Sequence, residues 1–264
     1  MSSNPGPLPE PYHTTPRTSL YLSDALTVLR GLPTGSVDAV IADPPYSSGG
    51  TTSAERTTKS TRSKYVSTSA QHALPDFEGD RRDQRGFAFW STLWLTECFR
   101  LTKPGGVCLV FTDWRQLPST SDALQAAGWV WRGQVVWHKP NPRTYPGRFT
   151  NHAEYALWGS HGPMGHGAGR PCLPGLYTVT PPHHTERVHI TQKPLKLLRD
   201  LVQIVPPGAM VLDPFMGSGT AGVAAVLEGR RFVGVELAEH FAQVAATRIG
   251  EAERESGDVD GGAA

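Results

Sequence analysis

Cysteine is scarce in this 264-residue chain, which holds only Cys98, Cys108 and Cys172, far apart and with no C-x-x-C pair. We therefore expect neither a disulfide framework nor a structural zinc site, and a reducing cytoplasm is the expected compartment. Apolar runs long enough to cross a membrane are also missing. Residues 1–7 have neither a basic start nor an apolar core, which predicts that they are not a secretory signal.

Two other kinds of ligand signature are absent or irregular. No Gly-Lys-Ser or Gly-Lys-Thr triplet occurs, so a Walker-type phosphate site is excluded. Histidines gather between residues 159 and 189, but their spacing is irregular and glycines and prolines intervene. We expect no metal site there and interpret these side chains as loop histidines that contact phosphate or nothing: His161, His166, His183, His184 and His189.

Charge is small in total but unevenly distributed. The net charge is +1, yet residues 251–260 carry five acidic side chains against one arginine, so the remaining chain is more basic than the total suggests. Basic residues gather in three segments that read as loops, where they can contact phosphates or can be ordinary solvated side chains. These residues are Arg56, Lys59, Arg62 and Lys64; Arg81, Arg82 and Arg85; and Lys139, Arg143 and Arg148.

The tetrapeptide Asp43-Pro44-Pro45-Tyr46 follows a short apolar run, residues 37–42, that reads as a buried strand. Two prolines in succession fix φ twice and supply no N–H, so the strand must end there. Its carboxyl end then presents a carboxylate, rigid carbonyls and an aromatic ring, at the edge where open α/β sheets bind ligands. A plain strand-to-loop turn is the alternative interpretation, because Asp-Pro is common in turns.

This set of groups suits an exocyclic amine on a nucleobase, which is a poor nucleophile because it is conjugated with the ring. The Asp43 carboxylate and the Pro44 carbonyl can both accept hydrogen bonds from that amine and direct its lone pair at an electrophile. Tyr46 can stack on the base, which must leave the duplex to be reached.

The rest of the chain alternates between short strands and helices and predicts one α/β domain over residues 19–250. Residues 1–18 and 251–264 are expected to be disordered, residues 47–85 to form a mobile DNA-contacting loop, and residues 138–190 to be a target-recognition insert. Seven strands are predicted, at residues 19–22, 37–42, 107–111, 129–137, 153–158, 210–212 and 232–235. Six helices are predicted, at residues 25–32, 87–103, 117–127, 195–205, 220–227 and 239–249; the aromatic residues of the second are expected in the core.

A second motif lies between the strand at residues 210–212 and the helix at residues 220–227. Gly217 and Gly219, followed by Gly222, let the chain turn tightly and let a ligand come close, and Glu236 at the end of the next strand can accept both hydroxyls of a ribose. The spacing also satisfies a dinucleotide fingerprint, but Asp213 would repel a pyrophosphate, and no nicotinamide half follows Glu236. S-adenosylmethionine, with its ribose, amino group and sulfonium, fits better.

With these motifs the chain resembles the DNA amino-methyltransferases of the β group, the permuted class with a DPPY tetrapeptide. The resemblance covers residues 18 to 250 and rests on five pieces in the order of that group. They are Leu20-Tyr21-Leu22-Ser23-Asp24-Ala25-Leu26, Asp43-Pro44-Pro45-Tyr46, Thr191-Gln192-Lys193-Pro194, Asp213-Pro214-Phe215-Met216-Gly217-Ser218-Gly219-Thr220 and Gly234-Val235-Glu236-Leu237. It implies a Rossmann-like, doubly wound, mostly parallel sheet of seven strands with one antiparallel strand.

The resemblance also implies roles for individual residues. Asp43, Pro44, Pro45 and Tyr46 would be catalytic, and Glu236 would hold the cofactor ribose. Asp24 would lie near the adenine or the methionine end of the cofactor, and Thr191, Gln192 and Lys193 would hold its carboxylate. The remaining cofactor contacts would come from the glycine loop, through Asp213, Phe215, Gly217, Ser218, Gly219 and Thr220.

The expected activity is therefore site-specific transfer of a methyl group to adenine N6 in duplex DNA by base flipping, without a metal. In the family, an aspartate at the first tetrapeptide position usually goes with adenine N6 and a serine with cytosine N4. Cytosine N4, RNA or a protein glutamine remain alternative substrates, and an inactive DNA-binding protein or a nucleotide-dependent oxidoreductase are alternatives from other classes. Relatives are often homodimers, but nothing in the sequence indicates an interface.

Overall fold

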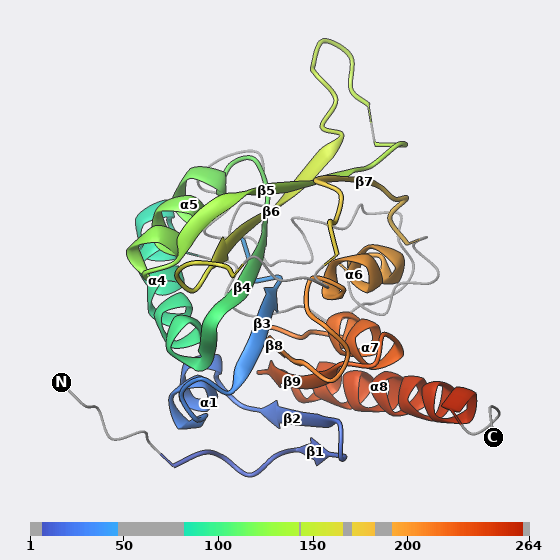
Figure 1. The fold of residues 1–264 in the computed structure, drawn as a ribbon. Helices are drawn as coiled ribbons and strands as arrows, with labels where there is room; N and C mark the ends of the chain where they lie inside the picture. Colours follow the sequence, from blue (N-terminus) through green and yellow to red (C-terminus); the bar gives the residue numbers. More distant parts are fainter. Residues whose placement is uncertain (1–6, 47–81, 143, 166–170, 183–191, 261–264) are drawn as a thin grey trace.

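A computed structural model of the chain describes residues 7–46, 82–142, 144–165, 171–182 and 192–260. In these residues nine strands form one sheet in the order β1-β2-β9-β8-β3-β4-β6-β5-β7, with helices on both faces (Figure 1). The α/β class is confirmed, but the predicted number of seven strands is wrong. The sheet is also more mixed than expected, because β1–β2, β4–β6 and β5–β6 all pair antiparallel.

The elements follow the predicted order along the chain. The strands are β1 (His13–Thr14), β2 (Thr18–Leu22), β3 (Val37–Ala42), β4 (Thr102–Thr112), β5 (Val130–His138), β6 (Ala153–Ser160), β7 (Leu176–Thr178), β8 (Met210–Asp213) and β9 (Arg231–Glu236). The helices are α1 (Ala25–Gly31), α4 (Gln84–Leu101), α5 (Leu117–Ala126), α6 (Leu195–Val202), α7 (Thr220–Leu227) and α8 (Glu239–Asp260).

The two additional strands lie where the sequence shows no strand pattern. β1 has two residues and β7 has three, too few for an alternation of apolar and polar side chains to be visible. β1 pairs with β2 within the segment predicted to be disordered, and β7 pairs with β5 within the predicted recognition insert. Both form because a neighbouring strand presents free backbone groups at an edge of the sheet.

The last helix, α8, corrects another prediction. It continues through residues 251–260, which the sequence predicts as a disordered tail. The N-terminal segment holds this extension, because Thr15 donates a hydrogen bond to Glu253 at 2.7 Å and Arg17 donates one to Ser256 at 2.5 Å. Long-range contacts of this kind outweigh the weak helical signal of an acidic, glycine-containing stretch.

Each face of the sheet has its own hydrophobic core. Helices α1, α4 and α5 cover one face and contribute Leu29, Trp94 and Leu124 to its core, whereas α6, α7 and α8 cover the other (Figure 1). In the described part of the chain no helix has the length and apolar character needed to cross a membrane.

The parallel strands at the centre of the sheet decide where a ligand can bind. β3 pairs with β8, and β8 with β9, all three parallel, so their carboxyl ends meet at one edge. Each end carries an acid: Asp43 follows β3, and Asp213 and Glu236 are the last residues of β8 and β9. Three carboxylates distant in sequence therefore surround the same space.

Candidate active site

A cavity of about 840 Å³ opens at this edge of the sheet, and the three carboxylates line it. Its size is that of a small-molecule or cofactor site. Most of the predicted site residues contribute to its wall: Asp24, Asp43, Pro44, Pro45, Tyr46, Gln192, Lys193, Asp213, Phe215, Gly217, Ser218, Thr220 and Glu236. Thr191 lies outside the described residues, as do residues 47–81 of the predicted DNA-contacting loop and residues 143, 166–170 and 183–190 of the predicted insert.

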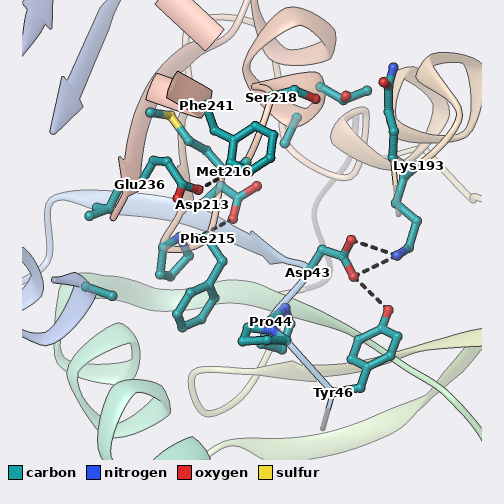
Figure 2. Close-up of a pocket in the computed structure, with 18 of the residues that line it drawn as sticks. Asp43, Pro44, Tyr46, Lys193, Asp213, Phe215, Met216, Ser218, Glu236 and Phe241 are labelled. Carbon is teal, nitrogen blue, oxygen red and sulfur yellow. Dashed lines mark hydrogen bonds and ion pairs between the residues drawn. The ribbon is translucent and has the colours of Figure 1, made fainter. Parts of the chain in front are cut away.

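At one end of the cavity, Asp43 is held by two side chains. The ammonium of Lys193 donates to both carboxylate oxygens at 2.7 Å, and the hydroxyl of Tyr46 donates to Oδ1 at 2.7 Å (Figure 2). A carboxylate offers about four acceptor positions, and these three contacts leave one on Oδ2. Among the contacts of the described residues, Asp43 is thus an oriented acceptor with one free position.

Lys193 is itself buried, with 5% of its side chain exposed, and it contacts a second carboxylate. Glu154 on β6 lies 3.5 Å from the same ammonium and also binds Lys139 at 2.8 Å. Burial alone would lower the pKa of Lys193, but Asp43 and Glu154 outweigh it and raise that pKa above its usual value. Burial would likewise raise the pKa of Glu154, and the two ammonium groups lower it instead.

The sequence does not identify Glu154 as a site residue, and it presents Lys139 only as one of several basic loop residues. The available signal is a single acid at the second position of the strand Ala153–Ser160, whose other described residues are apolar or small apart from Tyr155 and the terminal Ser160. Lys193, for its part, is predicted to hold the cofactor carboxylate. In this structure its ammonium contacts Asp43.

The Tyr46 ring lies beside the same ammonium, 5.3 Å from Nζ of Lys193. Burial, and then the charge of Asp43, raise the pKa of Tyr46 well above its ordinary value, so the phenol keeps its proton and acts as a donor. The predicted stacking of this ring on a base stays a prediction.

At the other end of the cavity, Asp213 and Glu236 interact with backbone groups instead. Asp213 accepts from the N–H of Phe215 at 2.9 Å, and Glu236 accepts from the N–H groups of Gly217, Leu237 and Ala238 at 2.9–3.0 Å. Burial raises the pKa of both carboxyls, that of Asp213 far above its ordinary value. Neither forms an ion pair within the described residues, so this end of the cavity favours a cationic ligand.

The glycine loop between these two acids is held mainly by packing. Gly219 has a φ of +78°, and a Cβ at this position would lie 2.8 Å from Cβ of Ala245 on α8. A Cβ on Gly222 would lie 2.4 Å from the side chain of Ile249. The sequence predicts that these glycines let a ligand come close; the structure shows that Gly219 and Gly222 let α7 approach α8.

Arg248 fixes the same loop from α8. Its guanidinium donates to the carbonyl and hydroxyl oxygens of Ser218 and lies 3.3 Å from the hydroxyl of Thr220. Both hydroxyl residues also line the cavity, in agreement with their predicted place in a ligand site. Sequence reasoning missed Arg248, because its partners lie about one helix and one strand earlier in the chain.

Two further walls complete the cavity. Asp24 caps α1 by accepting from the N–H of Thr27 at 3.2 Å. Phe215 packs against Trp90 and Trp94 of α4, with ring centroids 5.2 and 5.1 Å apart. Trp94 is fully buried, as predicted for the core, whereas Trp90 also lines the cavity.

The histidine segment does not reach this cavity where it is described. The Nδ1–H group of His161 donates to the carbonyl oxygen of Thr102 at 2.7 Å, and the imidazole ring lies on Phe99. His166, His183, His184 and His189 lie outside the described residues. Within the described ranges, no group of three or more His, Cys, Asp or Glu side chains is arranged to hold a metal ion.

Comparison with known proteins agrees with this geometry. A family model described as DNA methylase, of the N6/N4 type, matches residues 37–165 and 174–247. The Type II methyltransferase M.HinfI of Haemophilus influenzae is 27% identical over 260 residues, 90% of this chain and 69% of that protein. M2.DpnII of Streptococcus pneumoniae, another Type II methyltransferase, is 27% identical over 269 residues, 94% of each chain.

Solved structures share the fold. The complex of M1.HpyAVI with SAM superposes with a TM-score of 0.63 at 25% identity, over 88% of this chain and 98% of that one. The cytosine-N4-specific PvuII DNA methyltransferase superposes with a TM-score of 0.67 over 96% of each chain, at 18% identity. A likeness at that identity is one of fold alone.

Proposed function

Because the chain belongs to the family of N6/N4 DNA methylases, it is a DNA methyltransferase with S-adenosylmethionine as its cofactor, and we propose that it methylates adenine at N6 in duplex DNA. The observation that carries this proposal is the state of Asp43. Its carboxylate is charged, fixed by Lys193 and Tyr46, and keeps one acceptor position at the cavity. We assign the chain to the permuted group because its tetrapeptide precedes the glycine loop.

The target amine binds at the Asp43 end. One N–H of the amine donates to Oδ2 of Asp43 and the other to the carbonyl of Pro44, which draws the nitrogen lone pair out of conjugation with the ring. Pro45 keeps this turn rigid. The base must be flipped out of the duplex to reach the cavity, and Tyr46 packs against it.

The cofactor occupies the end that Asp213 and Glu236 line. These two carboxyls have raised pKa values and no ammonium partner within the described residues, so the residues present fit a ligand that carries positive charge. When bound, the cofactor supplies an electrophilic methyl group on a cationic sulfur. Glu236, aligned by three backbone N–H groups, accepts the ribose hydroxyls.

The remaining contacts to the cofactor come from the two flanking segments. The loop residues Gly217, Ser218 and Thr220, which line the cavity, border the cofactor, and Gly219 sets the turn of the same loop. Phe215 stands on the Trp90 side of the cavity. Asp24, Thr191 and Gln192 complete the cofactor side, whereas Lys193 serves the target-amine end through Asp43. The chain's own part in the transfer is therefore to orient two reactants at opposite ends of one cavity and to exclude water from between them.

Duplex DNA contacts the loop between β5 and β6, which extends far beyond the sheet (Figure 1). Tyr145 is half exposed there and Phe149 fully exposed, and the guanidinium of Arg148 lies 6.0 Å from the Tyr145 ring. Exposed aromatic rings beside basic groups suit bases and phosphates. This loop belongs to the recognition insert that we assign to residues 138–190.

The choice of adenine over cytosine rests on the aspartate at position 43, because the same fold occurs in the cytosine-N4-specific PvuII enzyme. The test is transfer of labelled methyl groups to unmethylated duplex DNA, followed by digestion to nucleosides and mass spectrometry. N6-methyldeoxyadenosine supports the proposal. N4-methyldeoxycytidine overturns the choice of base, and no label in DNA from protein that binds the cofactor overturns duplex DNA as the substrate, in favour of RNA or protein.

A further inference from the structure

Lys193 is shared between Asp43 and a carboxylate on another strand, and this sharing has a consequence for catalysis. We propose that Glu154 is a positioning residue for methyl transfer, which fixes the ammonium of Lys193 and thereby keeps Asp43 oriented and able to accept a hydrogen bond from the target amine. The inference rests on the function proposed above and adds a residue to it.

The geometry makes Glu154 the second anchor of Lys193. An ammonium has three N–H donors, and the two oxygens of Asp43, each at 2.7 Å, engage two of them. An oxygen of Glu154 lies 3.5 Å from the same ammonium. Lys193 belongs to no helix or strand and lies two residues before α6, so its position depends on these carboxylates and on the start of that helix.

Glu154 is well placed to serve as an anchor because rigid elements hold it. It lies in β6, which pairs with β4 on one side and with β5 on the other, and its partner in β5 is Trp137. Lys139, one residue beyond β5, binds it at 2.8 Å. A carboxylate on an inner strand, itself held by a second lysine, has little freedom to follow Lys193 if the ammonium moves.

The charges also explain why Lys193 needs a second carboxylate besides Asp43. A lone ion pair of Lys193 and Asp43 would direct all the attraction of the ammonium at the group that must bind the target amine. Glu154 takes part of that attraction, and Lys139 balances the added negative charge. The four side chains form a network of two carboxylates and two ammonium groups, in which Asp43 keeps an acceptor position for the substrate.

The ammonium of Lys193 faces the following groups: the carboxylates of Asp43 and Glu154, the hydroxyl-bearing ring of Tyr46, the ring of Phe111 at 5.2 Å and, further off, Asp213. Asp43 and Glu154 both raise the pKa of Lys193. Removing the charge of Glu154 therefore lowers the pKa of Lys193, and the variant loses the ammonium at lower pH than the wild type does.

The test compares Glu154→Gln with the wild type in single-turnover methyl transfer to duplex DNA, with S-adenosylmethionine affinity measured separately by calorimetry. We expect the rate to fall about tenfold to a hundredfold, because a misplaced acceptor costs alignment, while cofactor affinity changes little. The ratio of variant to wild-type rate should fall further between about pH 7 and about pH 10. Glu154→Asp, which keeps the charge, should recover part of the rate.

Glu228→Gln is the matched control. Glu228 pairs with Arg199 at 2.7 Å, is 18% exposed against 21% for Glu154, and does not line the cavity. This variant loses an ion pair of the same kind and should keep the wild-type rate at every pH. If Glu154→Gln does not fold, as judged by thermal unfolding, Glu154→Asp decides: a reduced rate supports the inference and a wild-type rate overturns it.

The outcomes separate this inference from the proposed function. A wild-type protein that does not methylate adenine in duplex DNA removes the proposed function. An active wild type with an equally active Glu154→Gln removes only the role of Glu154. A slow variant whose rate ratio does not depend on pH, or one that loses cofactor affinity and not rate, also overturns the inference, since Glu154 would then serve the fold or the cofactor.

Discussion

The carboxylates at the two ends of the cavity have different kinds of partner. Asp43 is compensated by a buried ammonium and a phenol, whereas the hydrogen bonds that Asp213 and Glu236 accept within the described residues come from backbone N–H groups. A compensated carboxylate keeps its charge and its orientation without a ligand. A buried carboxyl without a cationic partner has a raised pKa, and its ionised form is stabilised most when a cationic ligand binds. The contrast separates a preorganised acceptor from a site that its ligand completes.

The largest effect should come from removing the compensated charge. We expect Asp43→Asn to slow methyl transfer about a thousandfold or more, because the amide offers the target amine a weaker acceptor and a competing donor. Cofactor affinity should be largely kept. The variant should also be less stable, by about 2 kcal/mol, because Lys193 stays buried with one carboxylate fewer. Single-turnover assays and urea unfolding measure both; normal turnover would remove the role of Asp43.

A substitution in the glycine loop tests whether packing, rather than charge, stabilises the cofactor end of the cavity. Gly219→Ala should cost about 3 kcal/mol of unfolding free energy, because it combines a left-handed φ with a clash against α8. Gly35→Ala is the control, since Gly35 has a φ of +66° and nothing within 4 Å of the added Cβ. The control should cost only about 1 kcal/mol. Equal losses in urea unfolding would show that the contact with Ala245 is unimportant.

Asp213→Asn should have the opposite effect on stability from Asp43→Asn. Removing a buried, uncompensated charge should stabilise the cofactor-free protein by on the order of 1 kcal/mol at neutral pH. Because the folded pKa of Asp213 is raised, this gain should disappear as the pH falls below the ordinary pKa of an aspartate, where both proteins are neutral at that position. S-adenosylmethionine affinity should fall about tenfold. Thermal unfolding with and without cofactor measures both, and a destabilised variant would contradict the comparison.

The smallest effect is the pH dependence of cofactor affinity. Raised pKa values mean that Asp213 and Glu236 take up protons at higher pH than ordinary carboxyls, so affinity for a cationic ligand should weaken severalfold between about pH 7.5 and about pH 5.5. The affinity for S-adenosylhomocysteine, which lacks the sulfonium charge, should fall less over the same pH range. Calorimetry at the two pH values measures the difference, and identical pH dependence for both ligands would mean that these carboxyls do not respond to the sulfonium.

Much of the framework was predictable from local patterns. β3 is found where the sequence predicts it, because an apolar β-branched run and two prolines determine both its type and its end. Helices α1 and α7 likewise follow their caps and glycines closely. β7 and the extension of α8 were not predictable, since each depends on a neighbour that pairs or packs with it and not on its own residues.

Local sequence is sufficient to predict that three acids end three strands and that a glycine loop follows one of them, because strand ends, turns and helix starts are set by residues a few positions apart. The contacts of each acid depend instead on how distant strands pair. Lys193 reaches Asp43 across 150 positions of sequence, and Glu154 joins them because β6 inserts between β4 and β5. Partners of that kind follow from the order in which distant strands pair, and local physical chemistry does not specify that order.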